Sequence, residues 1–209
     1  MGRQTEAEQV FKIAIETSRG VLLSDPKDIY TQDALAWTYT HQGRYFFEHG
    51  TPAEAEKCFQ SAIDIRRELK EKPEHLAAFA ELVGTCPVSS LQDYDVAVTM
   101  IKAAIGMSPQ EARYHHIAAL VYIEVKKPQE AKTALDLCLL HRIEERAEDQ
   151  FALAIIHHLL EDAESAETAF DQGLDLLNKK TPGRIEPIRL RATAAGLIGI
   201  QEPAAEETP

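Results

Sequence analysis

The chain of 209 residues carries 34 acidic and 22 basic side chains, and its formal net charge of −12 disfavours nucleic acid, whose phosphates require a basic surface. It is 44% hydrophobic but holds no uninterrupted apolar run near the roughly 18 residues of a membrane span, and it begins without a basic and apolar signal sequence. We therefore expect a cytoplasmic protein that binds neither nucleic acid nor membranes.

Apolar residues recur at helical spacing along almost the whole chain. A leading helix is predicted over residues 4–22, and a last helix over 185–199 is expected to cap the apolar end of the fold. Between them the pattern predicts four helix pairs, over 27–70, 73–107, 110–142 and 147–178. Residues 1–200 are expected to form a single domain, and residues 201–209 a disordered acidic tail.

Prolines and capping residues mark the expected helix starts. Six prolines precede periodic apolar segments, where a fixed φ suits the first helical turn: Pro26, Pro52, Pro73, Pro109, Pro128 and Pro187. The residues from Thr51 to Glu54 and from Ser108 to Glu111 have the capping-box pattern. Asp93 is expected to cap the helix that follows an unusually long loop.

Four of the predicted helices repeat one stripe, made of a small residue, a large apolar residue four positions on and a small residue three further. The copies are Ala55, Phe59 and Ala62; Ala97, Ile101 and Ala104; Ala131, Leu135 and Cys138; and Ala166, Phe170 and Gly173. Their first members lie 42, 34 and 35 residues apart (97−55, 131−97, 166−131). This period indicates a repeat array, in which each unit buries its apolar face against its neighbours.

A unit of about 34 residues built as helix, turn and helix resembles the tetratricopeptide repeat. Gly43, Phe46 and Gly50 precede Ala55 where that family has its glycine, its aromatic residue and its turn glycine, and Pro109 stands at the closing proline. The resemblance implies an all-α fold, a right-handed α-solenoid of antiparallel helix pairs with about four repeats, a leading helix and a capping helix.

A finer resemblance concerns the long loop and the last helix. The segments from Leu82 to Asp93 and from Leu190 to Ile200 are similar to the repeat-bearing C-terminal regions of some bacterial serine/threonine protein kinases. This resemblance implies a regulatory part of a bacterial signalling protein. We expect no kinase activity, because the sequence has no glycine-rich phosphate loop, no HRD triplet and no DFG triplet.

Catalytic and metal sites are not expected. The adjacent pairs His115 with His116 and His157 with His158 do not face one way on a helix. Their repeat positions place His116 and His158 roughly 10 Å apart along equivalent helices. We predict no catalytic residue, no metal site and no cofactor.

Other reactive side chains are interpreted as structural. The acidic run Glu144, Glu145, Glu148 and Asp149 is interpreted as a solvated helix face. The three cysteines, Cys58, Cys86 and Cys138, lack the spacing of paired ligands and are expected to be small buried residues rather than disulfides.

In a stacked array the first helices line a concave groove. Mapping the groove positions of the family onto this chain implies a partner-binding site made of Trp37, Thr40, Arg44, Phe47, Arg113, His116, Leu120, Phe151, Ile155 and His158. Apolar anchors mixed with arginine and histidine fit the recognition of a peptide or helix. The competing interpretation is that the aromatic residues pack between helices.

The expected function is a non-catalytic scaffold that binds a protein or peptide in this groove. Two alternatives stay open. One is a ligand-sensing regulatory domain, in which a terminal helix closes the groove around a small molecule and Arg44 or Arg113 lines the pocket. The other is a structural module that forms a homodimer through an end helix.

Overall fold

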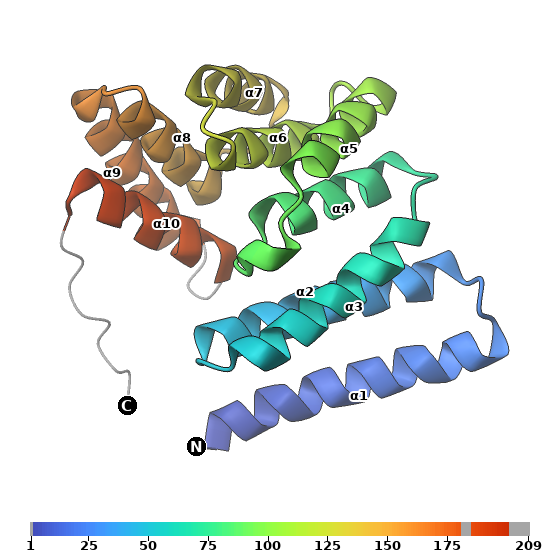
Figure 1. The fold of residues 1–209 in the computed structure, drawn as a ribbon. Coiled ribbons are helices and arrows are strands. Elements are labelled where there is room, and N and C mark those ends of the chain that lie inside the picture. Colours follow the sequence, from blue (N-terminus) through green and yellow to red (C-terminus); the bar gives the residue numbers. More distant parts are fainter. Residues whose placement is uncertain (1, 181–184, 201–209) are drawn as a thin grey trace. The chain divides into compact units, whose positions relative to one another are not determined.

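The computed structural model describes residues 2–180 and 185–200, and all regular structure in these residues is helical (Figure 1). The predicted all-α fold class is confirmed. The chain divides into two compact units, Met1–Pro109 and Gln110–Pro209. The single domain over residues 1–200 stays a prediction, and the expected acidic tail lies outside the described residues.

Unit 1 contains two packed helix pairs preceded by a long helix. Its elements are α1 (Gly2–Ser24), α2 (Ile29–Glu48), α3 (Pro52–Glu68), α4 (Pro73–Thr85), a 3₁₀ turn η1 (Ser89–Leu91) and α5 (Tyr94–Met107). Helix α2 packs against α3, α4 packs against α5, and α3 joins the two pairs by contacting α4. Helix α1 lies along α2 (Figure 1). The large apolar side chains of Phe59, Phe79 and Ile101 are buried in this core.

Unit 2 repeats the arrangement. Its elements are α6 (Ala112–Glu124), α7 (Pro128–His141), α8 (Ala147–Leu159), α9 (Ala163–Lys180) and α10 (Ile185–Ile198). Helices α6 and α7 form one pair, α8 and α9 the next, and α10 packs on both α8 and α9. Leu190, Ala194 and Ala195 form the buried face of α10. Among the described residues, no helix in either unit is long and apolar enough to cross a bilayer.

Helix starts follow the proline signals only in part. Pro52, Pro73 and Pro128 stand at the first turn of α3, α4 and α7. Pro26 and Pro109 lie before α2 and α6 but outside them, and Pro187 is the third residue of α10. Because α2 begins at Ile29, the side chain of Asp28 caps it by accepting from the amide of Tyr30 at 3.1 Å.

Both predicted capping boxes are wrong, whereas the cap at Asp93 is confirmed. The hydroxyl of Thr51 donates to the carbonyl of Phe46 at 2.9 Å instead of accepting from α3. At α6 the cap is Glu111, whose carboxylate accepts from the amide of Arg113 at 3.2 Å. Ser108 is instead the C-cap of α5. Asp93 accepts from the amide of Val96 at 3.0 Å.

The bend between paired helices has one backbone conformation in three of the pairs. Gly50, Lys126 and Glu161 have φ values of 75°, 58° and 62°. Each stands five residues before the first small residue of its stripe (55−50, 131−126, 166−161). The pair of α4 and α5 bends differently: the 3₁₀ turn η1 replaces the tight bend.

The repeated stripes are packing surfaces. Their first members, Ala55, Ala97, Ala131 and Ala166, are fully buried. Gly173 on α9 lets the ring of Phe151 on α8 approach the backbone, because a Cβ added there would lie 2.6 Å from a carbon of that ring. Small residues at these positions therefore set how closely the two helices of a pair approach.

Candidate functional site

Four of the predicted groove residues lie along one side of α2. Trp37, Thr40, Arg44 and Phe47 follow one another at i, i+3, i+7 and i+10, which extends them over about 15 Å of the helix. Trp37 and Phe47 are 55% and 43% exposed, whereas Thr40 is half-buried and the side chain of Arg44 is only 11% exposed. We call these four residues the α2 stripe.

A ring contact, a hydrogen bond and an ion pair involve members of the α2 stripe. The indole of Trp37 lies against the ring of His41, with ring centroids 3.9 Å apart. The hydroxyl of Thr40 donates to the carbonyl of Ala36 at 2.9 Å. The guanidinium of Arg44 lies 3.6 Å from a carboxylate oxygen of Glu81, which links α2 to α4 within unit 1. The exposed aromatic rings are therefore carried on a helix that is anchored at its middle.

The predicted groove residues of unit 2 lie mostly inside the unit. Arg113 is exposed and His158 is half-buried. His116, Leu120, Phe151 and Ile155 are buried, and the ring of Phe151 packs against Phe170 with centroids 5.5 Å apart. The structure thus brings these residues together mainly as packing contacts, and their part in partner binding stays a prediction.

A buried polar cluster joins α6, α7 and α8. It consists of His116, Cys138, Arg142 and Asp149, which we call the α6–α8 cluster. Asp149 and Cys138 are fully buried, and the side chains of His116 and Arg142 are 10% and 9% exposed. Such polar groups are tolerated in a core only when they are paired.

Asp149 is the centre of the α6–α8 cluster. Its Oδ1 accepts from Nδ1 of His116 at 2.6 Å and from Nη2 of Arg142 at 3.2 Å. Its Oδ2 lies 2.6 Å from Nε of Arg142, an ion-pair contact in which the N–H does not point along the line of the two atoms. Cys138 Sγ lies 3.6 Å from Oδ1 and accepts from Nη2 of Arg142 at 3.3 Å.

These contacts favour the charged forms of the cluster. Burial opposes the charge on His116, but the hydrogen bonds to Asp149 and Cys138 outweigh it and raise the pKa of His116 to about 9. Burial likewise opposes the charge on Asp149, but the hydrogen bond from His116 and the charges of His116 and Arg142 lower the pKa of Asp149. One buried carboxylate therefore faces two cations.

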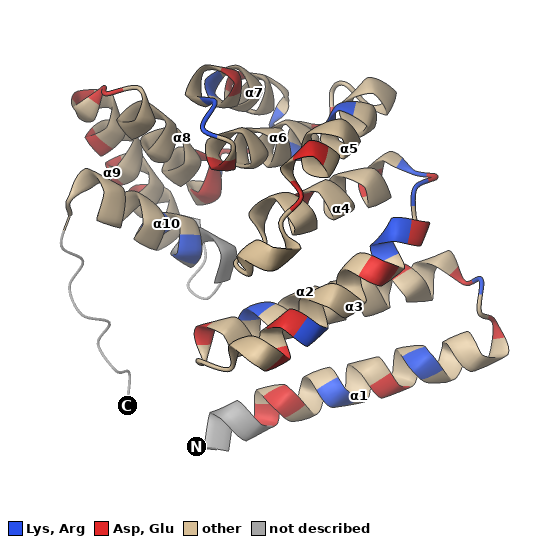
Figure 2. Ribbon diagram, in the orientation of Figure 1, with Lys and Arg blue, Asp and Glu red and all other residues tan. Residues whose placement is uncertain are grey.

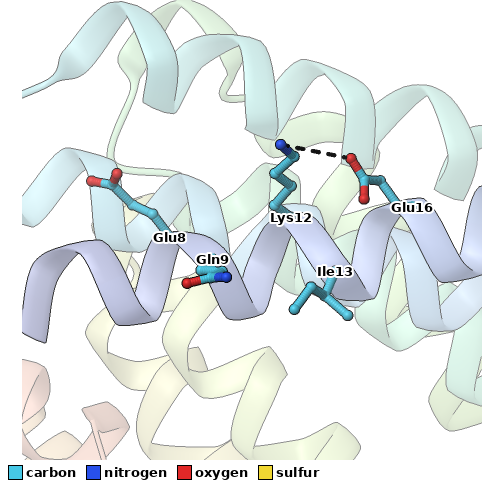
Figure 3. Close-up of a pocket in the computed structure, with 5 residues that line it drawn as sticks. All are labelled: Glu8, Gln9, Lys12, Ile13 and Glu16. Carbon is cyan, nitrogen blue, oxygen red and sulfur yellow. Dashed lines mark ion pairs between the residues drawn. The ribbon is translucent and has the colours of Figure 1, made fainter.

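Two of the surface hollows on the described part of unit 1 are defined by their lining residues. Figure 3 shows the first, whose lining residues Glu8, Gln9, Lys12, Ile13 and Glu16 all come from α1, with Lys12 and Glu16 paired at 4.0 Å. The second lies between the start of α2, the end of α3 and the start of α4, and is lined by Lys27, Ile29, Gln32, Glu68, Leu69, Glu71 and His75. Neither is lined by Arg44 or Arg113, which the ligand-sensing alternative places in a closed pocket.

Comparisons with known proteins identify the fold. No family model and no curated protein matches the chain. A thermophilic TPR protein of Thermus thermophilus is 18% identical, with a TM-score of 0.57 over 94% of this chain and 95% of that one. BtubC (BKLC) from P. vanneervenii is 16% identical, with a TM-score of 0.56 over 94% and 85%. A tetratricopeptide repeat protein from Parabacteroides merdae is 15% identical, with a TM-score of 0.52 over 95% and 72%. The chain has the tetratricopeptide repeat fold.

Within this tetratricopeptide repeat fold, sequence reasoning missed most of the α6–α8 cluster. Asp149 was assigned to a solvated acidic face, and that assignment is wrong: Asp149 is fully buried, whereas Glu144 and Glu145 are exposed. A signal was present, because Asp149 shares a helix face with the buried residues Ala152 and Ile156 at i+3 and i+7. Nothing in the local sequence indicated Arg142, which lies at the end of α7.

The raised pKa of His116 predicts a pH-dependent stability for the tetratricopeptide repeat fold. A histidine whose pKa rises from 6.5 to about 9 on folding stabilises the fold fully below pH 6.5, and this contribution is lost as the pH rises through 9. The loss amounts to about 3 kcal/mol over that window. Urea unfolding of the wild type and of His116→Gln, both in EDTA, should give free energies that converge between pH 6.5 and 9. Parallel profiles would contradict the charged imidazole.

Proposed function

We propose that the chain is a non-catalytic interaction scaffold that binds a peptide or helix of a partner protein on the α2 stripe. The observation that carries the proposal is the exposure of Trp37 and Phe47, which are 55% and 43% accessible on one side of a helix whose opposite side is buried. The tetratricopeptide repeat fold supports protein binding in general.

The physical argument concerns the aromatic rings. Tryptophan and other large rings contribute most of the free energy at protein interfaces when a partner covers them. Trp37 is already held against His41, so that covering it costs little side-chain entropy. Two exposed rings on residues that lie about 15 Å apart along the helix axis match an extended peptide or an amphipathic helix of three turns. The ligand of this stripe is therefore a segment with at least two apolar anchors.

The proposal includes no catalytic step and no cofactor. Its location in the cytoplasm and its exclusion of nucleic acid rest on composition and charge. A regulatory role in bacterial signalling rests on the resemblance of residues 82–93 and 190–200 alone. Arg113 and His158 are the accessible groove residues predicted for unit 2, and the proposal for the α2 stripe does not rest on them.

The test compares three proteins in a pull-down from lysate, analysed by mass spectrometry. The first is the wild type, and the second carries Trp37→Ala and Phe47→Ala. The third is a matched control with Leu23→Ala and Leu140→Ala, which removes two exposed apolar side chains, 86% and 73% accessible, from other helices. We expect a partner that the wild type and the control retain and that the α2 stripe variant loses by at least tenfold, with equal circular dichroism for all three.

The captured segment is then tested as an isolated peptide. Trp37 is the only tryptophan of the chain, so its emission reports directly on the α2 stripe. Peptide binding should shift the emission to shorter wavelength and protect Trp37 from acrylamide quenching, because the partner removes the indole from water. The Phe47→Ala variant keeps the probe and should show the same shift at a higher peptide concentration.

Equal capture by all three proteins would overturn the α2 stripe as the binding site. It would favour the second candidate, self-association through α1, which a separate observation supports. Val10, Ile13 and Val21 recur along the outer side of α1 and are 66%, 55% and 44% exposed. Acidic and basic residues alternate between them (Figure 2). Light scattering of the wild type and of Ile13→Glu would then measure whether a dimer forms through this helix.

A further inference from the structure

We propose that the α6–α8 cluster is a binding site for a zinc ion, with Nδ1 of His116, Sγ of Cys138 and Oδ1 of Asp149 as the protein ligands. One ligand atom from each of these three residues lies within 4.8 Å of the other two, in the core of unit 2. They come from three different helices, α6, α7 and α8, so an ion bound to them would tie two neighbouring helix pairs together.

Two of the three distances between ligand atoms can be compared with those on a tetrahedral ion, and the third, between His116 and Cys138, is at most 4.8 Å. Ligand atoms on tetrahedral zinc lie about 3.3 to 3.7 Å apart, given bonds of 2.0 to 2.3 Å. Sγ of Cys138 and Oδ1 of Asp149 are already 3.6 Å apart. Nδ1 of His116 and Oδ1 of Asp149, now 2.6 Å apart across a hydrogen bond, must separate by roughly 0.7 Å.

Arg142 is positioned to orient two of the proposed ligands, Asp149 and Cys138. Its Nε lies 2.6 Å from Oδ2 of Asp149, and its Nη2 donates to Oδ1 at 3.2 Å on the same carboxylate that His116 and Cys138 contact. Its Nη2 donates to Sγ of Cys138 at 3.3 Å, a contact that stabilises a thiolate. Ligands in metal sites are commonly held by such outer contacts, which fix their direction.

The charge balance permits the exchange of protons for metal. Zinc requires the thiolate form of Cys138 and a bare Nδ1 on His116, so the thiol proton and the Nδ1 proton leave to solvent. One Zn²⁺ replaces two protons, and the net charge of the cluster is unchanged. The summed charge of His116, Cys138 and Asp149 with their bound protons or ion is therefore the same in both states. Zinc binding places no additional net charge beside the buried guanidinium of Arg142.

The donor set selects the metal class. One thiolate, one imidazole and one carboxylate favour zinc over magnesium or calcium, which prefer oxygen ligands. Three protein ligands leave the fourth tetrahedral position for water. Water reaches the edge of the cluster where the side chains of His116 and Arg142 are 10% and 9% exposed. The four histidines considered in the sequence analysis contribute only His116 to this set.

The test uses the full chain, cobalt chloride as a spectroscopic probe and zinc chloride as competitor. The key variant is Cys138→Ala, which should fold because Ala62 and Ala104 stand at the equivalent positions of two other stripes. Cys58→Ala is the matched control, since Cys58 is also a buried thiol on the second helix of a pair. We expect the wild type and the control to bind one Co²⁺ with a thiolate-to-cobalt absorption band that Zn²⁺ abolishes.

In Cys138→Ala the thiolate band should be absent and the affinity for Zn²⁺ at least a hundredfold lower. Zinc should also raise the thermal midpoint of the wild type and leave that of Cys138→Ala unchanged, which separates loss of binding from loss of folding. The proposal is overturned if the wild type shows no thiolate band with stoichiometric Co²⁺, or if Cys138→Ala keeps the same zinc affinity. Cobalt bound without the sulfur band would mean surface histidines only.

Discussion

Replacing Asp149 by alanine is expected to lower the stability of unit 2 by about 3 to 5 kcal/mol. The substitution leaves two buried cations, His116 and Arg142, without their shared anion. His116 can release its proton, but the guanidinium of Arg142 stays charged at any ordinary pH. The cost is therefore dominated by an uncompensated charge on a side chain that is only 9% exposed.

Hydrogen exchange and urea unfolding measure this effect in the presence of EDTA. Amides of α6, α7 and α8 should lose protection in Asp149→Ala, and the loss should be larger at pH 6 than at pH 9, because His116 is charged at the lower pH. The control is Asp136→Ala, which removes an exposed carboxylate paired with Lys132 at 2.7 Å on α7. That control should cost no more than about 0.5 kcal/mol. Equal losses in the two variants would contradict the central place of Asp149.

Phe151→Ala is expected to destabilise unit 2 by about 3 to 5 kcal/mol, which is the usual cost of removing a buried phenylalanine. The ring is fully buried, packs on Phe170 and lies against Gly173. Far-UV circular dichroism during urea unfolding gives the loss for the chain as a whole. Emission from Trp37 follows α2 and gives a separate measurement for unit 1.

A double-mutant cycle with Gly173→Ala tests the close approach directly. In the wild type the new Cβ would lie 2.6 Å from the ring of Phe151, and overpacking of this kind costs about 1 to 3 kcal/mol. In the Phe151→Ala background the ring is absent, and the same change should gain about 0.5 to 1 kcal/mol of helix propensity. The sign of the Gly173→Ala effect should therefore reverse. Equal effects in both backgrounds would show that the ring does not rest on Gly173.

The destabilisation expected for Phe151→Ala affects the design of any test of partner binding. A variant that includes Phe151→Ala loses packing inside unit 2, so a lost partner could reflect unfolding rather than a lost contact. Trp37 and Phe47 avoid this ambiguity, because much of each ring is already in water. Substitutions at accessible positions therefore separate recognition from folding.

The helix pairs were predictable because their signals are local and repeated. The small and large residues of each stripe recur at helical spacing, and the burial of Ala55, Ala97, Ala131 and Ala166 confirms that they face the packing surfaces. Cys138 takes the last small position of the third stripe, and its predicted burial is confirmed. Because the same pattern occurs in four copies, one irregular residue in a single copy does not prevent its detection.

The polar cluster was not predictable because its contacts join residues far apart in the chain. Asp149 and His116 are 33 residues apart, nearly one repeat, and their 2.6 Å contact exists only when neighbouring helix pairs pack. The mapping of groove positions onto unit 2 stays a prediction. It assigned Phe151 and Ile155 to a groove-facing set, while the close approach at Gly173 places the ring of Phe151 between α8 and α9.

The bend shared by three helix pairs limits which substitutions are tolerated at its positive-φ position. Lys126 and Glu161 hold left-handed backbone angles that cost an ordinary residue about 1 to 2 kcal/mol, so glycine at either position would relieve strain. Gly50 has the same geometry, and any replacement there would introduce that strain, although the space around it is open. Substitution to glycine at Lys126 or Glu161 should therefore stabilise the bend, whereas substitution of Gly50 should destabilise it. The three bends therefore share a positive φ angle but not a residue type. The residue type determines only whether the backbone at the bend is strained.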